Sequence, residues 1–412
     1  MKQLSQSESI WSKNFILLLV SAVFMYIATF MFTPTLPLFA RSIGVSDPSV
    51  GGFIILVYTV GSLVPRVIWG NLADRWKRKP VFLIGVIIMV AAAPFYGLFV
   101  SLPGILAIRL IQGIGFSASS TSSSTMAVDL TPASRMTEGI GLYTLANTIG
   151  MALGPDLGLN LFENHSAHWL IGAGVLAGIL SLGLGMLLNY EKKRSLIKTE
   201  SNFVHKDTPD FGTPSAETVK LPTKHGTLFE KSVLTTSLVA FFAVMPYGAI
   251  MAYIASYGVD RGINNIGLYF SVYALSLFLV RLVIGRLTDS YGLTKVILSG
   301  IAFMFGGLVV LYWANSLEIF MLSAVLFGLG FGVVFPLLQA TAYMFCPEDR
   351  RGVASATLFS TTDLAYGLGA VVLGFGIKAL GYSAAFAGLA IFVVISIIFY
   401  MALIYPRLKY SH

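Results

Sequence analysis

The stretch Gly70-Asn71-Leu72-Ala73-Asp74-Arg75-Trp76-Lys77-Arg78-Lys79-Pro80 decides how this chain is organised. It is a short polar run between two long apolar segments. A weaker copy, Gly285-Arg286-Leu287-Thr288-Asp289, stands 215 positions later, and Arg66 and Arg281 are separated by the same interval. A constant interval over most of a chain predicts two halves that are built alike and run in parallel.

Composition places most of the chain in a lipid bilayer. Hydrophobic residues make up 56% of the 412 residues and charged residues only 11%, and the mean hydropathy is +0.80. A helix needs about 20 apolar residues to cross about 30 Å of hydrocarbon. Twelve segments qualify, which predicts an all-α membrane protein with twelve transmembrane helices in two six-helix bundles. They lie near residues 14–39, 50–72, 81–101, 102–128, 138–161, 167–189, 232–259, 262–288, 295–315, 316–343, 350–378 and 382–405.

The distribution of the 27 Lys and Arg residues predicts the topology. Of these, 21 fall on one side of the predicted membrane, and Arg41, Arg261 and Lys378 fall on the other. By the positive-inside rule, both termini are cytoplasmic in a multi-pass protein of the plasma membrane. The net charge of +8 therefore reflects orientation and does not indicate a nucleic-acid partner.

One segment interrupts the apolar pattern. Residues 190–231 contain eight cations, six acids and three prolines without a helical stripe, which is typical of a solvated tether. We therefore expect a first bundle at residues 1–190, a cytoplasmic linker at 191–231 and a second bundle at 232–412.

Enzyme signatures are absent from the sequence. It contains no H-E-x-x-H, no G-x-S-x-G and no phosphate-binding loop. Its single cysteine, Cys346, cannot form an internal disulfide or a cysteine-based metal site. We expect neither enzymatic activity nor a metal or other cofactor.

The polar run at Gly70 resembles the signature loop of the major facilitator superfamily, which lies between its second and third helices. In that family the loop's Asp and Arg latch the two halves on the cytoplasmic side. The resemblance implies this role for Gly70, Asp74 and Arg75 or Arg78, with Asp129 as a partner. It also implies transport of a small molecule through the bilayer, and we expect a monomer.

The predicted fifth helix carries a second resemblance. Gly141, Gly150, Gly154, Pro155 and Gly158 follow the Gly-x8-Gly-x3-Gly-Pro-x-x-Gly spacing, which is similar to the motif of drug/proton antiporters in the same superfamily. This similarity implies export. Small residues at these intervals also let a neighbouring helix pack closely, and we expect a tight seam between the two halves.

Ionisable residues within the spans are candidates for proton coupling, because a charge inside a bilayer costs at least about 2.5–3.5 kcal/mol. Twelve residues separate Arg351 from Asp363, or about 18 Å of helix, which places Asp363 near the midplane. Arg109 lies in an Arg-x-x-Gln-Gly-x-Gly pattern that the resemblance links to proton coupling. We predict Asp363 first and Asp156 second as proton carriers, and an interaction of Arg109 with Asp156 at a shared depth.

Substrate-binding candidates are aromatic, amide and charged residues expected near the middle of the spans: Tyr26, Tyr58, Arg66, Asn147, Tyr247, Tyr253, Tyr273, Arg281, Gln339 and Asp363. Arg66 is also long enough to reach the cytoplasmic surface. The favoured interpretation is proton-coupled export of an amphipathic compound by two bundles that rock about a central site. The alternatives are export of an anionic metabolite such as a metallophore or siderophore, a facilitator or importer of a sugar or metabolite, and a lipid flippase or non-transporting receptor.

Overall fold

The computed structural model describes residues 10–132, 135–189, 230–347 and 351–410, and in these ranges the chain forms helices and no strands. The predicted linker at 191–231 lies almost entirely outside them. The helices of the first half are α1 (Lys13–Phe30), α2 (Phe32–Ser42), α3 (Ser49–Leu63), α4 (Arg66–Arg75), α5 (Arg78–Ala92), α6 (Phe95–Leu98), α7 (Leu102–Leu130), α8 (Met136–Asn164) and α9 (Ala167–Met186).

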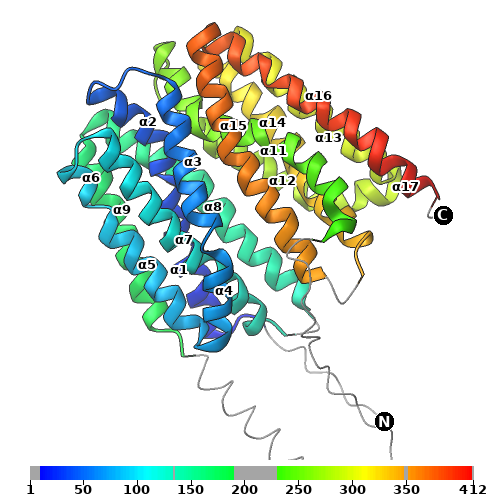
Figure 1. Cartoon of the computed structure of the whole chain (residues 1–412), viewed down its shortest axis with the longest axis horizontal. Coiled ribbons are helices and arrows are strands. Elements are labelled where there is room, and N and C mark those ends of the chain that lie inside the picture. Colours follow the sequence, from blue (N-terminus) through cyan, green and yellow to red (C-terminus); the bar gives the residue numbers. More distant parts are fainter. Residues whose placement is uncertain (1–9, 133–134, 190–229, 348–350, 411–412) are drawn as a thin grey trace, which may run out of the picture.

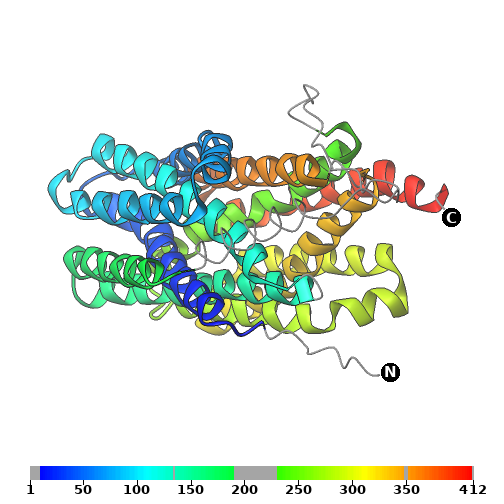
Figure 2. The ribbon, with the colours of Figure 1, turned by 90° about the horizontal axis from the view of Figure 1, so that it is seen from below.

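The second half repeats this plan. Its helices are α11 (Leu234–Asp260), α12 (Leu268–Tyr291), α13 (Leu293–Val310), α14 (Leu317–Met344), α15 (Arg351–Gly388, with a non-helical Gly381), α16 (Ala390–Phe399) and α17 (Tyr405–Tyr410), and short 3-10 or π turns lie at Lys231–Val233, Leu311–Trp313 and Tyr400–Ile404. Figure 2 shows the first half, in blue to green, on one side of the molecule and the yellow and red helices of the second half on the other.

Prolines account for two of the breaks between short helices. α1 ends at Phe30, shortly before Pro34 and Pro37. α3 ends at Leu63, directly before Val64 and Pro65, and α4 continues the same span toward Arg75. A proline removes one backbone donor and clashes with the preceding turn, so the helix kinks there.

Eleven helical segments in the described residues are long and apolar enough to cross a membrane. The predicted fifth span, α8, is not among them although it has 29 residues. Asp156, Glu163 and several asparagines lower its hydropathy. It still packs as a bundle helix, because it contacts α1 in its own half and α12 in the other. The predicted twelve-helix membrane fold is therefore confirmed.

The two halves meet along α3 with α15, α8 with α12, and α2 with α11. We call the end that carries Asp47 and Lys378 the outer end, following the charge distribution. The ribbons of the halves lie close together there and spread apart toward α4 and the beginning of α15 at the other end (Figure 1).

Candidate functional site

An ion pair inside the bundle connects the two halves. The guanidinium of Arg66, in the first turn of α4, lies 2.6 Å from the carboxylate of Asp363 on α15. The two side chains are 29% and 31% exposed, whereas Oδ2 of Asp363, the oxygen that meets Arg66, is itself buried. Arg66 is long enough to reach the cytoplasmic surface, but its guanidinium instead pairs with the carboxylate of the opposite half.

Arg109 lies deeper, behind Tyr58. Its guanidinium carbon is 4.9 Å from the centre of the Tyr58 ring, and the side chain is 1% exposed. Gln112 accepts a hydrogen bond from Arg109 at 3.5 Å and from the Tyr96 hydroxyl at 2.8 Å. The Nε and Nη2 atoms of Arg109 have no hydrogen-bond partner among the described residues.

The predicted interaction of Arg109 with Asp156 is wrong. Asp156, on α8, contacts the beginning of α12. A side chain at Gly267 would collide with the Asp156 carboxylate. Equal depth did not bring the two together because Arg109 faces Tyr58, within the first half, while Asp156 faces the second half.

Tyrosines line the second half next to the ion pair. The ring of Tyr247 lies 4.6 Å from Phe331, 5.4 Å from Tyr366 and 6.1 Å from Tyr273. Tyr366 is three residues after Asp363, so both lie on one face of α15. Sequence analysis missed Tyr366, although its spacing from Asp363 was the signal that could have found it.

Arg281 lies near this tyrosine group. Its charge acts on the hydroxyls of Tyr273 and Tyr247, and its Nε atom has no hydrogen-bond partner in the described part of the chain. The hydroxyl of Tyr273 is also without a partner there, and its side chain is fully buried. These groups form a polar position with unused hydrogen-bonding capacity.

A chain of hydroxyl groups occupies the first half. Tyr26 and Tyr143 share a hydrogen bond of 3.0 Å between their hydroxyls, and Ser123 and Tyr143 share one of 2.7 Å. The Asn147 side chain interacts with the Tyr26 hydroxyl. Tyr26 and Asn147 are thus brought together as predicted candidates, whereas Tyr143 was not foreseen.

Tyr253 belongs to the outer end and not to this central group. Its hydroxyl donates to the carbonyl oxygen of Pro48 at 2.6 Å and accepts from the backbone N–H of Gly52 at 2.5 Å. Lys378 on α15 lies 2.6 Å from Asp47 in the loop before α3. These contacts join the halves at the outer end, and we call Asp47, Lys378 and Tyr253 the outer clamp.

Asp47 is the titratable group of the outer clamp that lies outside the spans. Hydrogen bonds from Lys378 and from Ser49 lower the pKa of its carboxyl to about 2. Both partners favour the charged carboxylate.

The remaining predicted residues lie elsewhere. Gln339 donates to the Tyr343 hydroxyl one turn further along α14, at 3.2 Å. Arg78 at the beginning of α5 forms an ion pair with Asp129 near the end of α7. The side chains of Asp74 and Arg75 lie outside the described part of the structure.

The glycine ridge of α8 packs within the first half, so the predicted seam between halves is wrong. A Cβ at Gly158 would stand 2.5 Å from the carbonyl oxygen of Met31, and one at Gly154 would stand 3.0 Å from that of Ile27. Gly150 lies equally close to Tyr26. The ridge faces α1, and the side of α8 that carries Ala152 and Asp156 meets α12.

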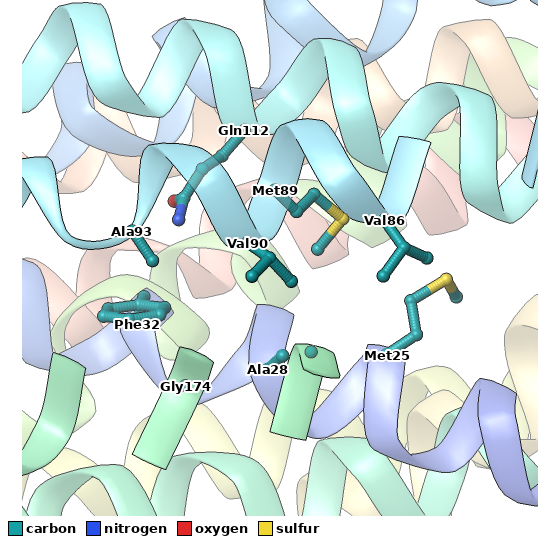
Figure 3. Close-up of a pocket in the computed structure, with 10 residues that line it drawn as sticks. Met25, Ala28, Phe32, Val86, Met89, Val90, Ala93, Gln112 and Gly174 are labelled. Atoms are coloured by element: carbon teal, nitrogen blue, oxygen red, sulfur yellow. The ribbon is translucent and has the colours of Figure 1, made fainter. Parts of the chain in front are cut away.

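A small pocket lies between α1, α2, α5, α7 and α9 (Figure 3). Figure 3 shows the side chains of Met25, Met89, Val90 and Phe32 around it, with Gln112 at one side. It is enclosed in the first half and is apart from the ion pair, so we assign it to imperfect packing between helices.

The amino-acid sequence matches the Major Facilitator Superfamily over residues 18–265 and 233–411. The chain belongs to this superfamily. It is a multi-pass transporter of the plasma membrane, not an enzyme, and among superfamily members it resembles the drug/proton antiporters.

Three relatives of this superfamily member cover most of its length. It is 25% identical to the multi-drug resistance efflux pump PmrA homolog of Lactococcus lactis, over 94% of both chains. It is 22% identical to the staphylopine export protein of Staphylococcus aureus, over 85% of this chain and 87% of that protein. It is 24% identical to the class H tetracycline resistance protein of Pasteurella multocida, over 88% and 89%.

Solved structures support the fold. A bacterial homolog of the human lysosomal transporter Spinster, described as inward-facing and unoccupied, superposes with a TM-score of 0.73 at 15% identity, over 96% of this chain and 97% of that one. The nucleoside transporter NupG superposes with a TM-score of 0.75 at 13% identity, over 95% and 100%.

Proposed function

We propose that this transporter exports a small amphipathic compound in exchange for protons. The observation that carries the proposal is the Arg66–Asp363 ion pair, which connects the moving halves at a partly exposed position. The names of the relatives, which include a multi-drug efflux pump, an exporter and a tetracycline resistance protein, support export.

Protonation of Asp363 removes the attraction that holds Arg66 to the opposite half. The charged carboxylate is stabilised by the guanidinium while the pair is formed, and the neutral acid is not. A proton taken up from the outer side therefore keeps the pair apart, and formation of the pair on the cytoplasmic side releases the proton. Cargo that binds at Asp363 competes with the proton, which is the requirement for exchange.

The energy supplied by one proton is sufficient for concentration of a cargo. One charge that crosses a potential of about 100 mV contributes about 2.3 kcal/mol. Because 1.4 kcal/mol corresponds to a factor of ten, this supports a gradient of about 50-fold per proton for a cargo that carries no net charge.

Further roles follow from the same scheme. Residues 1–190 and 232–412 act as the two moving units, and residues 191–231 connect them on the cytoplasmic side. Gly70, Asp74, Arg75, Arg78 and Asp129 form the cytoplasmic latch, and the Arg78–Asp129 pair supports the position of this loop. Arg109 contributes to proton coupling through Tyr58, and Asp156 is a second candidate carrier at the α8–α12 contact.

The test uses purified protein in liposomes with an imposed pH gradient and a fluorescent cationic dye as cargo. We expect gradient-driven dye movement by the native protein, and its loss in Asp363→Asn. Asp289→Asn is the matched control, because Asp289 is exposed at the end of α12. Dye movement that ignores the gradient in the native protein, or full coupling in Asp363→Asn, would contradict proton exchange at this residue.

A further inference from the structure

The central region has separate positions for a positive and a negative group. Arg66 is paired with Asp363, but Arg281 has no carboxylate among its described neighbours and lies close enough to Tyr247 and Tyr273 for its charge to act on them. The first half supplies the reason. Asn147 lies 12 residues past Arg135, just as Asp363 lies 12 residues past Arg351, so the first half has a neutral amide at the depth where the second half has an acid.

The tyrosine group bridges the two positions. Tyr366 is three residues after Asp363 on α15 and contacts Tyr247, Tyr247 contacts Tyr273, and the charge of Arg281 acts on Tyr247 and Tyr273. A row of aromatic rings therefore lies between a carboxylate and a guanidinium. Aromatic faces attract organic cations and pack against flat apolar rings.

The requirement for exchange with protons determines whether a cationic or an anionic group of the cargo can bind at Asp363. A cationic group that binds Asp363 displaces Arg66 and competes with the proton, as exchange requires. An anionic group that took Arg66 away from Asp363 would instead favour protonation of that acid, and cargo and proton would then bind together. An anionic group is compatible with exchange only at a position away from Asp363, and Arg281 is such a position.

We propose that the cargo is a zwitterionic aromatic compound whose cationic group binds at Asp363 and whose carboxylate binds at Arg281, with the Tyr273 hydroxyl as a second donor. This inference rests on the proposed function, because it uses proton exchange to assign the two ends. It narrows the cargo from amphipathic compounds in general to those that carry both charges on a flat ring system.

Two dyes that differ in one carboxylate test the assignment. Rhodamine B is a zwitterion, and its ethyl ester is a cation with the same ring system. In detergent and without a gradient, we expect the native protein to bind rhodamine B about tenfold more tightly than the ester, which corresponds to about 1.4 kcal/mol. Fluorescence polarisation measures both affinities.

Substitutions at Arg281 and Asp363 test the binding of the carboxylate and of the cationic group separately. Arg281→Gln should bind both dyes with the affinity that the native protein shows for the ester, and Arg281→Lys should recover part of the preference. Arg286→Gln, at an exposed position on the same helix, is the matched control and should keep the full preference. Asp363→Asn should weaken the binding of both dyes while their ratio is kept.

Equal or absent binding of the two dyes by the native protein would overturn the proposal, and so would a preference that survives in Arg281→Gln. Because these measurements use no proton gradient, they are independent of the transport test. A failure of proton exchange would appear only in liposomes, and a failure of the charge assignment would appear in detergent.

Discussion

Removal of the negative charge at Asp363 should shift the equilibrium between conformations of the transporter. Two unit charges about 4 Å apart attract by about 4 kcal/mol at an effective dielectric constant of about 20. The side chains of Arg66 and Asp363 are 29% and 31% exposed, and screening by solvent reduces the net contribution to about 1–2 kcal/mol. Asp363→Asn should therefore lower the population of the structure described above, relative to its alternatives, by about 5- to 30-fold.

Distances between spin labels measure this shift. Labels at Asn71 on α4 and Tyr291 on α12 report the separation of the halves at the end opposite the outer clamp, and both positions are exposed. Cys346 is the one native cysteine, so Cys346→Ser leaves only the two introduced cysteines to react with the spin label. We expect shorter distances in Asp363→Asn than in the native sequence.

A double-mutant cycle shows whether the shift in the distances depends on the ion pair between Arg66 and Asp363. Arg66→Gln and the double variant Arg66→Gln/Asp363→Asn should give the same shift as Asp363→Asn, because each removes the same attraction. Acidification should reproduce the shift in the native sequence and add nothing in Asp363→Asn. Additive effects, or a distance distribution that Asp363→Asn leaves unchanged, would refute the assignment of the pair as the proton-sensitive contact.

Three further predictions concern packing and the outer clamp. Because the pKa of Asp47 is lowered from 3.8 to about 2, its carboxylate stabilises the closed outer clamp at pH values above 3.8, and this stabilisation is lost as the pH falls toward about 2. The yield of cross-linking across Asp47 and Lys378 should therefore be constant from about pH 8 to about pH 5. Tyr253→Phe removes two hydrogen bonds between the halves, so cysteines at the outer end should become more reactive, consistent with a loss of about 1 kcal/mol per bond. Gly158→Ala should destabilise the protein by about 1–3 kcal/mol because α1 must move, whereas Gly141→Ala, with open space around its Cβ, should not lower the unfolding temperature.

Sequence reasoning succeeded where a single physical rule decides the outcome. Hydropathy and length determine the spans, and the 215-residue interval predicts the repeated plan that the helices confirm. Depth along a helix also follows from residue counting, which placed Asp363 within the bundle. The direction in which a side chain points around the helix does not follow from depth alone.

The errors share that cause. Arg109 and Asp156 were assigned to one level, but they face different neighbours, Tyr58 and Gly267. The glycine ridge of α8 predicted a close contact correctly and its partner wrongly, because small residues specify how near a helix can approach and not which helix approaches. The sequence of one helix carries no information on that choice, which depends on the packing of the whole bundle.

The duplicated scaffold explains how one transporter can treat two charges differently. Arg66 and Arg281 are separated by the 215-residue interval, and among the described residues Arg66 has a carboxylate opposite it whereas Arg281 has none. In the proposed mechanism, a proton opens the ion pair at Arg66, and Arg281 can bind an anion at any pH at which the cargo is charged. A zwitterion exchanged for one proton carries no net charge outward, so each cycle would move one positive charge inward. A membrane potential alone, without a pH gradient, should then drive export.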